Sequence, residues 1–185
     1  MDIINGERDC MKILNARDTK HWAWAQTQNF IDIFSGACIY AQGKNGFDAV
    51  TLLAQFALET GYGEKILIVN TYPNLTGEWI DSKNLGNIKA FKSWHGKKGY
   101  KRVLEYVDGK KTYPIEPFRI YDSYKDAIDD YIEVIKKNFP KAYNERKDGD
   151  KYLYQLQTGR KKYATDTDYE NKIKRIRQQN FILEV

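Results

Sequence analysis

One carboxyl group in this chain lies where proton-transfer chemistry is favoured. Glu59 ends the segment Ala49–Glu59, in which Thr51 and Gln55 are the only other polar residues. This pattern predicts a helix that is buried on most sides, and Glu59 continues one of its apolar rows. Burial and the unpaired carbonyls of the last helical turn both favour the neutral acid, so we expect a raised pKa. Such an acid can protonate a leaving group; the alternative is a solvated surface glutamate.

The residues after Glu59 predict a tight turn. Gly61 and Gly63 flank Tyr62, which is typical of a glycine that ends a helix and of a turn that brings the aromatic ring beside the acid. The segment "ALETGYG" resembles the acid motif of the lysozyme-like N-acetylglucosaminidases of glycoside hydrolase family 73. Lytic transglycosylases and muramidases carry related helix-glutamate-turn segments, so both remain alternatives.

A second carboxylate lies in a predicted β-hairpin over Val103–Tyr113. The Asp-Gly pair at 108–109 is a type I′ turn signal between alternating segments, and it sets Glu105 opposite Thr112. The sequence "LEYVDGK" resembles the hairpin of family 73, in which the glutamate before the tyrosine is the second catalytic carboxylate. The resemblance therefore implies a catalytic role for Glu105; from the residues alone, a polar cross-strand pair with Thr112 is favoured.

A third similarity lies near the C-terminal end. The sequence "YATDTDYENKIKRI" at 163–176 resembles the Tyr-Ala-Thr-Asp-Pro-x-Tyr sequence of the family, with Thr167 in place of proline. Tyr163 corresponds to a tyrosine that lines the catalytic cleft, and the alternative is a buried tyrosine with a satisfied hydroxyl. A helix is expected after Asp166, with Tyr169 facing the core.

Residues 84–96 carry the remaining similarity. "NLGNIK" at 84–89 corresponds to a family segment that usually reads Asn-Leu-Phe-Gly-Ile-Lys, and this chain lacks the phenylalanine. "WHG" at 94–96 resembles a Trp-x-Gly motif, whose tryptophan is either a sugar platform or a core residue. The resemblance implies a set of substrate-binding residues: Tyr62, Asn84, Lys89, Trp94 and Tyr106.

The predicted elements are mostly helical. Apolar periodicity predicts a helix over Phe30–Gln42, and a capping pattern at Ser123 opens another that ends before Pro140. Residues 141–157 are expected to form a further short helical region. Residues 66–83 lack a clean period, and the turn-rich sequence "NTYPNLTGEW" at 70–79 is expected to form a loop or an insertion near the site. The family resemblance covers Phe30 to Phe181. It implies an α+β, predominantly α fold: a lysozyme-like, two-lobed domain with a small β-hairpin lobe.

The resemblance and the weak periodicity at the start of the chain divide it into two parts. We expect an N-terminal extension at 1–23 and the glucosaminidase catalytic domain at 24–185. The chain has a net charge of +5, a pI near 9.0 and 14% aromatic residues, which favours anionic partners and stacking on flat faces. The two histidines and two cysteines lack ligand spacing, so we assign no metal and no cofactor.

The function implied by the resemblance is hydrolysis of the β-1,4 bond that follows N-acetylglucosamine in peptidoglycan. Glu59 would protonate the leaving oxygen. Glu105 would activate water, stabilise the oxocarbenium-like charge or act as a nucleophile; alternatively the substrate's acetamido oxygen attacks, with Glu105 and Tyr163 orienting it. Two alternatives of another class are a basic nucleic-acid-binding protein and a catalytically dead wall-binding structural protein.

The expected partners and location follow from the same function. Glycan strands of peptidoglycan are the partner, without nucleic acid or stable membrane insertion, and the protein is expected to be a monomer. Residues 1–25 are charged throughout and show no secretory signal. We therefore expect synthesis in the cytoplasm and action on the bacterial wall, as a phage endolysin released through a holin-permeabilised membrane or as a wall-opening part of a delivery machine.

Overall fold

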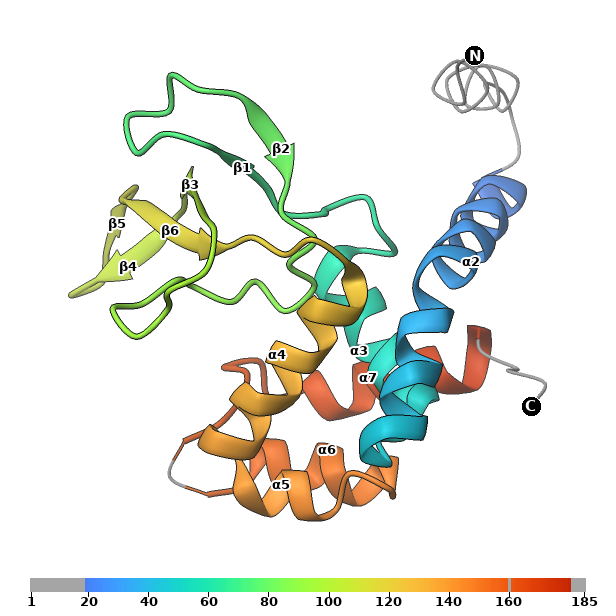
Figure 1. The fold of residues 1–185 in the computed structure, drawn as a ribbon. Coiled ribbons are helices and arrows are strands. Elements are labelled where there is room, and N and C mark those ends of the chain that lie inside the picture. The colour runs from blue at the N-terminus through green and yellow to red at the C-terminus, as the bar shows by residue number, and fades with distance from the viewer. Residues whose placement is uncertain (1–18, 160, 181–185) are drawn as a thin grey trace.

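The computed structural model describes residues 19–159 and 161–180, and Figure 1 shows a helical body with the strands gathered on one side of it. This arrangement agrees with the predicted predominantly helical α+β class. In chain order the described elements are α2 (Thr19–Asn45), α3 (Ala49–Thr60), β1 (Ile68–Asn70), β2 (Trp79–Asp81), β3 (Lys98–Arg102), β4 (Glu105–Val107), β5 (Lys110–Thr112), β6 (Ile115–Arg119), α4 (Tyr124–Asn138), α5 (Pro140–Asn144), α6 (Gly149–Gln157) and α7 (Tyr169–Asn180).

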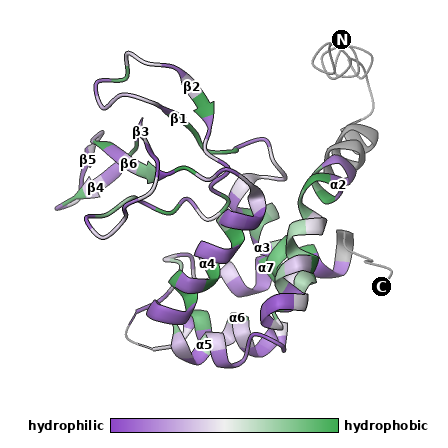
Figure 2. Cartoon of the chain, in the orientation of Figure 1, coloured by the Kyte–Doolittle hydropathy of each residue, from purple (hydrophilic) through white to green (hydrophobic). Residues whose placement is uncertain are grey.

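Helix α3 lies at the centre of the helical body and carries Glu59 in its last turn. Asp48 caps its first turn by accepting a hydrogen bond from the Thr51 amide at 2.6 Å. Gly61 ends it in the left-handed conformation that glycine adopts without a Cβ penalty. Figure 2 shows α3 as predominantly hydrophobic. The predicted buried helix is confirmed, and its end places the acid at the edge of the core.

Helix α2 is longer than the predicted helix over Phe30–Gln42. It begins at Thr19, so the predicted boundary after residue 23 falls inside it, while residues 1–18 lie outside the described part of the chain. The side chains that gave the periodic signal, Phe30, Phe34 and Ala41, are buried against the core. Figure 1 shows the start of α2 extending beyond the helical body. Since an apolar face is needed only where a helix packs, the sequence pattern marked the packed part alone.

The C-terminal helices enclose the other sides of α3. Ser123 caps α4 as predicted, by accepting a hydrogen bond from the Asp126 amide at 3.2 Å. Helices α5 and α6 occupy the predicted short helical region. Tyr169 and Ile173 of α7 are buried, as predicted for this helix. The buried core face of α4 is formed by Ala127, Ile128, Tyr131, Ile132 and Ile135.

The β lobe is larger than the predicted hairpin. Strands β2, β1, β3 and β6 form an antiparallel sheet in that order, and β1 and β2 flank the loop predicted at 70–79. A small second core of Leu67, Val69 and Phe118 supports this sheet. The predicted loop is present as the connection between β1 and β2. The two strands that flank it were not predicted, because they have three residues each, too few to show an alternating pattern.

The predicted hairpin is present as β4 and β5. Glu105 pairs with Thr112, and Val107 pairs with Lys110, which is the predicted register. Asp108 and its following glycine have φ values of 51° and 74°, as a type I′ turn requires. The turn chemistry therefore determines which residues face each other across this hairpin.

Close packing of α6 on α3 leads to a stability prediction for Gly149. A Cβ added there would lie 2.0 Å from Oγ1 of the buried Thr51. We expect Gly149→Ala to destabilise the protein by about 1–3 kcal/mol, the usual cost of overpacking. Urea unfolding followed by circular dichroism measures the change. Adding Thr51→Ala removes the hydroxyl that the new Cβ would meet, so the double variant should recover part of the lost free energy of unfolding. If the effects of the two substitutions simply added, this explanation would be contradicted.

Candidate active site

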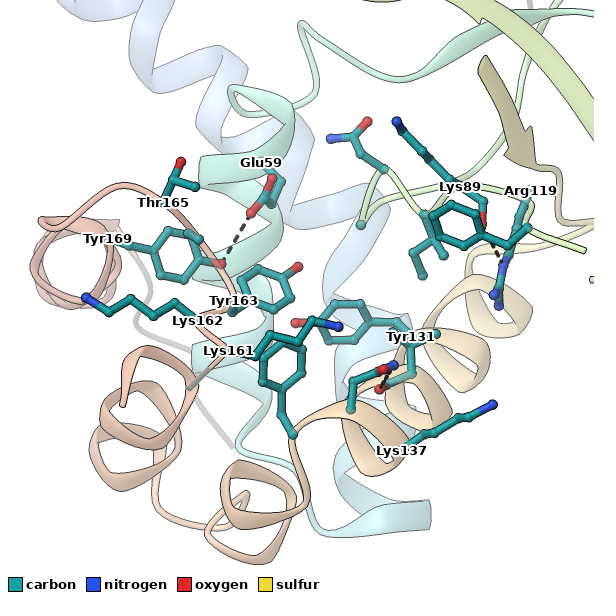
Figure 3. Close-up of a pocket in the computed structure, with 18 of the residues that line it drawn as sticks. Glu59, Lys89, Arg119, Tyr131, Lys137, Lys161, Lys162, Tyr163, Thr165 and Tyr169 are labelled. Atoms are coloured by element: carbon teal, nitrogen blue, oxygen red, sulfur yellow. Dashed lines mark hydrogen bonds between the residues drawn. The ribbon is translucent and has the colours of Figure 1, made fainter. Parts of the chain in front are cut away.

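A pocket of about 810 Å³ lies where α3, α4 and the start of α7 meet the loop that leads to β3. Glu59 and Tyr169 lie at one side of it, and Lys89 and Arg119 lie across from them (Figure 3). Tyr131 of α4 also lines the pocket. The pocket therefore joins residues from the helical body with residues from the β lobe, as expected for a two-lobed domain.

Glu59 is the acid that the pocket presents. Its carboxyl group is largely buried, and burial raises its pKa above the ordinary value for glutamate. A hydrogen bond from the Tyr169 hydroxyl to Oε1, at 3.2 Å, acts in the opposite direction by stabilising the charged form. Since burial is the larger cause, the group is disposed to hold a proton that it can donate.

Tyr163 lines the pocket beside Glu59, where Figure 3 shows its ring between Tyr169 and Tyr131. Its ring centroid lies 5.5 Å from that of Tyr169 and 6.3 Å from that of Tyr131. Burial and the negative charge of Glu59 both raise the pKa of the Tyr163 phenol, so it stays protonated. It is thus a neutral hydrogen-bond donor at the position that the sequence resemblance assigned to the cleft.

Glu105 is linked to the pocket through Lys89. The Lys89 ammonium lines the pocket and forms an ion pair with Glu105 Oε1, and Glu116 Oε2 lies 3.6 Å from the same nitrogen. Thr112 uses its hydroxyl on the backbone carbonyl of Glu105, at 3.2 Å, and does not pair with the carboxylate. The carboxylate of Glu105 is therefore directed toward the loop that carries Lys89, although it does not line the pocket itself.

Asn84 holds the loop before Lys89 in shape. It is 3% exposed, and its amide nitrogen donates to the carbonyl oxygens of Ile88 and Arg119, at 2.9 and 3.0 Å. Its amide oxygen accepts from the Ile88 backbone at 2.8 Å. Because both ends of the amide are bound to the backbone, Asn84 supports the pocket wall and does not itself line the pocket.

Trp94 packs on the protein and does not line the pocket. Its ring lies 4.6 Å from the guanidinium of Arg119 and 5.8 Å from the ring of Tyr121, and its indole N–H donates to the Lys97 carbonyl at 2.9 Å. The exposed aromatic ring of the pocket is instead Phe91, which is 66% exposed. Of the two roles expected for Trp94, packing on the protein is the one that its contacts match, and the exposed flat ring in the pocket belongs to Phe91.

Two other predicted substrate contacts lie outside the pocket lining. Tyr62 has a φ of 56°, and its ring packs at 6.0 Å from that of Phe30 in α2, so the turn directs it toward the helical body. Tyr106 is 64% exposed on β4. The tight turn after α3 is present as predicted, and its tyrosine packs against α2 without lining the pocket.

Several residues in and behind the pocket were not predicted. Gln55 could have been found, because it is a polar residue four positions before Glu59 on an otherwise apolar helix. The basic residues of the pocket come from separate elements of the fold. The sequence therefore indicated them only through the positive net charge of the chain. They are Arg119, Lys137, Lys161 and Lys162, which line the pocket together with Lys89.

The pocket has no metal cluster beside it in the described part of the chain. Within residues 19–159 and 161–180, histidine, cysteine and acidic side chains do not gather in groups of three that could hold a metal ion. In the same ranges, every helix is too short or too polar to cross a bilayer.

The raised pKa of Glu59 predicts a pH-dependent cost in stability. The folded protein binds this proton more tightly than the unfolded chain does. The contribution of Glu59 protonation to the free energy of unfolding is therefore fully present below the ordinary glutamate pKa and is lost as pH rises through the raised pKa of the folded state. Glu59→Gln removes this titration. We expect the melting temperature of the variant relative to the parent to be higher at pH 8 than at pH 4. Calorimetry at several pH values measures this, and a constant difference would contradict it.

Comparison with known proteins identifies relatives of the whole domain. A family profile described as "Glucosaminidase: Mannosyl-glycoprotein endo-beta-N-acetylglucosaminidase" matches residues 36–181. The curated peptidoglycan hydrolase FlgJ of Vibrio parahaemolyticus is 35% identical over 136 residues, which are 72% of this chain and 41% of that protein. The chain thus matches less than half the length of this relative.

Solved structures give the same result. A peptidoglycan hydrolase mutant from Sphingomonas sp. A1 is 36% identical, with a TM-score of 0.64 over 83% of this chain and 94% of that one. A C-terminally truncated glycoside hydrolase domain of Salmonella typhimurium FlgJ is 29% identical, with a TM-score of 0.66 over 83% and 96% of the two chains. These matches confirm the predicted lysozyme-like fold. Profile, sequence and fold agree, and this chain belongs to the glucosaminidase family, glycoside hydrolase family 73.

Proposed function

We propose that this protein hydrolyses peptidoglycan at the β-1,4 bond that follows N-acetylglucosamine. The observation that carries the proposal is the largely buried Glu59 at the end of α3, whose pKa is raised and which opens onto the pocket. Sequence relatives that are named peptidoglycan hydrolases support the choice of polymer. The basic pocket lining also suits a glycan whose stem peptides carry carboxylates.

In the proposed reaction Glu59 donates its proton to the glycosidic oxygen as the bond to the anomeric carbon breaks. The oxocarbenium-like charge that develops on the sugar is stabilised by the carboxylate of Glu105, which is paired with the pocket residue Lys89. A water molecule then adds to the anomeric carbon and gives up its proton to a carboxylate. This second step has three alternative forms. Glu105 activates the water as a base, Glu105 attacks the anomeric carbon as a nucleophile, or the acetamido oxygen of the substrate attacks it.

The products of wall digestion test the bond that is cleaved. Mass spectrometry of purified peptidoglycan treated with the protein should show fragments that end in a reducing N-acetylglucosamine. A reducing N-acetylmuramic acid end would identify a muramidase, and an anhydro end formed without water would identify a lytic transglycosylase. Either result would overturn the proposed specificity while leaving the substrate unchanged.

The biological role that we propose is that of a wall-opening lysin that is made in the cytoplasm and reaches the wall by release or delivery. Expression of the full chain in a bacterial cytoplasm tests this role. Lysis is expected only when a pore-forming holin is co-expressed, because the substrate lies beyond the membrane. Lysis without the holin would contradict this route.

A further inference from the structure

A chain of buried hydrogen bonds runs from Glu59 into the core of the helical body. The Tyr169 hydroxyl donates to Glu59 Oε1 and accepts from Gln55 Nε2 at 2.8 Å. The Tyr152 hydroxyl donates to Gln55 Oε1 at 3.3 Å, and it lies 3.2 Å from the Tyr131 hydroxyl. Gln55 is fully buried and lies one turn before Glu59 on α3. Figure 3 shows the Tyr169 end of this chain at the pocket.

The partners of Gln55 distinguish the two ends of its amide. Its oxygen accepts from Tyr152, so its NH₂ group is directed at the oxygen of Tyr169. A phenol has one proton to donate. Two groups could receive the Tyr169 proton: Glu59 Oε1, at 3.2 Å, and the phenol of Tyr163, whose ring lies 5.5 Å from that of Tyr169. Because the Tyr169 oxygen already receives a hydrogen bond from Gln55 and the carboxyl oxygen is the stronger acceptor, we assign the Tyr169 proton to Glu59.

This direction has a consequence for the acid. Oε1 of Glu59 accepts a hydrogen bond whether the carboxyl group is charged or neutral, so the carboxyl proton resides on Oε2. A Tyr169 hydroxyl that was free to rotate would instead accept the proton of neutral Glu59 on the Oε1 side. The transferable proton would then point into the protein and away from the leaving oxygen.

We propose that Gln55 is a positioning residue that acts through Tyr169 and keeps the transferable proton of Glu59 on Oε2, the oxygen that does not contact Tyr169. The inference rests on the proposed role of Glu59 as the general acid. It goes beyond a structural role for Gln55, which would require only that a buried amide be satisfied.

The test is Gln55→Met, which keeps the length of the side chain and removes its amide donor and acceptor. We expect kcat on soluble glycan fragments to fall about tenfold, part of the 10²–10⁴-fold that general acid catalysis contributes, with KM unchanged. In this variant the Tyr169 hydroxyl can rotate and accept a hydrogen bond from neutral Glu59, which stabilises the neutral form. The pKa of Glu59, measured by NMR on ¹³C-labelled carboxyl groups, and the basic limb of the pH–kcat profile should therefore move to higher pH.

A double-mutant cycle separates action through Tyr169 from any other effect. Tyr169→Phe alone should also raise the pKa of Glu59, because a hydrogen bond to the carboxylate is lost. Adding Gln55→Met to Tyr169→Phe should then change the pKa no further. An unchanged pKa in Gln55→Met, or an equal shift with and without the Tyr169 hydroxyl, would overturn the proposal.

Two variants keep the test decisive. Thr51→Val alters a buried polar side chain one turn before Gln55 on the same helix, and it should leave the pH profile at that of the parent.

Should Gln55→Met fail to fold, Tyr152→Phe removes the group that orients the amide. It should shift the pKa of Glu59 in the same direction by a smaller amount, and no shift would count against the proposal. The NMR titration needs no substrate, so a parent protein that fails to cleave glycan contradicts the proposed function separately.

Discussion

Glu59→Gln is expected to lower the rate of wall hydrolysis by about 10²–10⁴-fold, the usual contribution of a general acid. The amide has the size of the carboxyl group, and its oxygen can still accept the hydrogen bond from Tyr169. It has no proton of suitable acidity to give to the leaving oxygen. Release of reducing sugars from purified peptidoglycan measures the rate, and circular dichroism verifies that the variant is folded.

The chain offers a matched control for this prediction. Glu64 follows α3 and is exposed, so Glu64→Gln makes the same change in charge close to the acid without altering the pocket. Its rate should equal that of the parent. A Glu59→Gln protein that clears bacterial walls as fast as the parent would exclude Glu59 as the general acid.

Glu105→Gln is expected to lower kcat/KM by about 10²-fold, because the carboxylate that activates water or stabilises the sugar cation is lost. KM is expected to change little, since the charge that Glu105 stabilises develops only in the transition state. Steady-state kinetics on soluble glycan fragments measure both constants. The anomeric form of the first product, followed by NMR, separates an inverting reaction from the two retaining ones.

Glu116→Gln is the matched control for the second carboxylate. Glu116 and Glu105 both contact the Lys89 ammonium, so each variant removes one anionic partner of that lysine. Only the loss of Glu105 should reduce the rate strongly. Nearly full activity in Glu105→Gln would refute the two-carboxylate mechanism and would favour a lytic transglycosylase, which needs a single acid.

The sequence alone determined the features that depend on neighbouring residues. The apolar run before Glu59 and the glycine after it determine a buried helix that ends at Gly61. The Asp-Gly pair at 108–109 determines the register that places Glu105 opposite Thr112. Both signals are local, because capping and turn geometry are set within a few residues.

The sequence was less informative where roles depend on the direction of a side chain. Trp94, Tyr62 and Asn84 are in the predicted segments, but their side chains pack on Arg119, on α2 and on the backbone. A motif establishes that an aromatic or amide group is present near a site. Which way it points depends on neighbours from other elements, and these neighbours also made Phe91 the exposed ring of the pocket.

Only the tertiary structure decided how the acid is surrounded. Tyr169 lies 110 residues after Glu59 in the chain, and its contact with the carboxyl group exists because α7 packs against α3. The same packing joins Gln55 to Tyr169 and, through α6, to Tyr152. Local sequence determines that a carboxyl group is buried at a helix end; the hydrogen bonds that direct its proton come from helices that meet only in the folded protein.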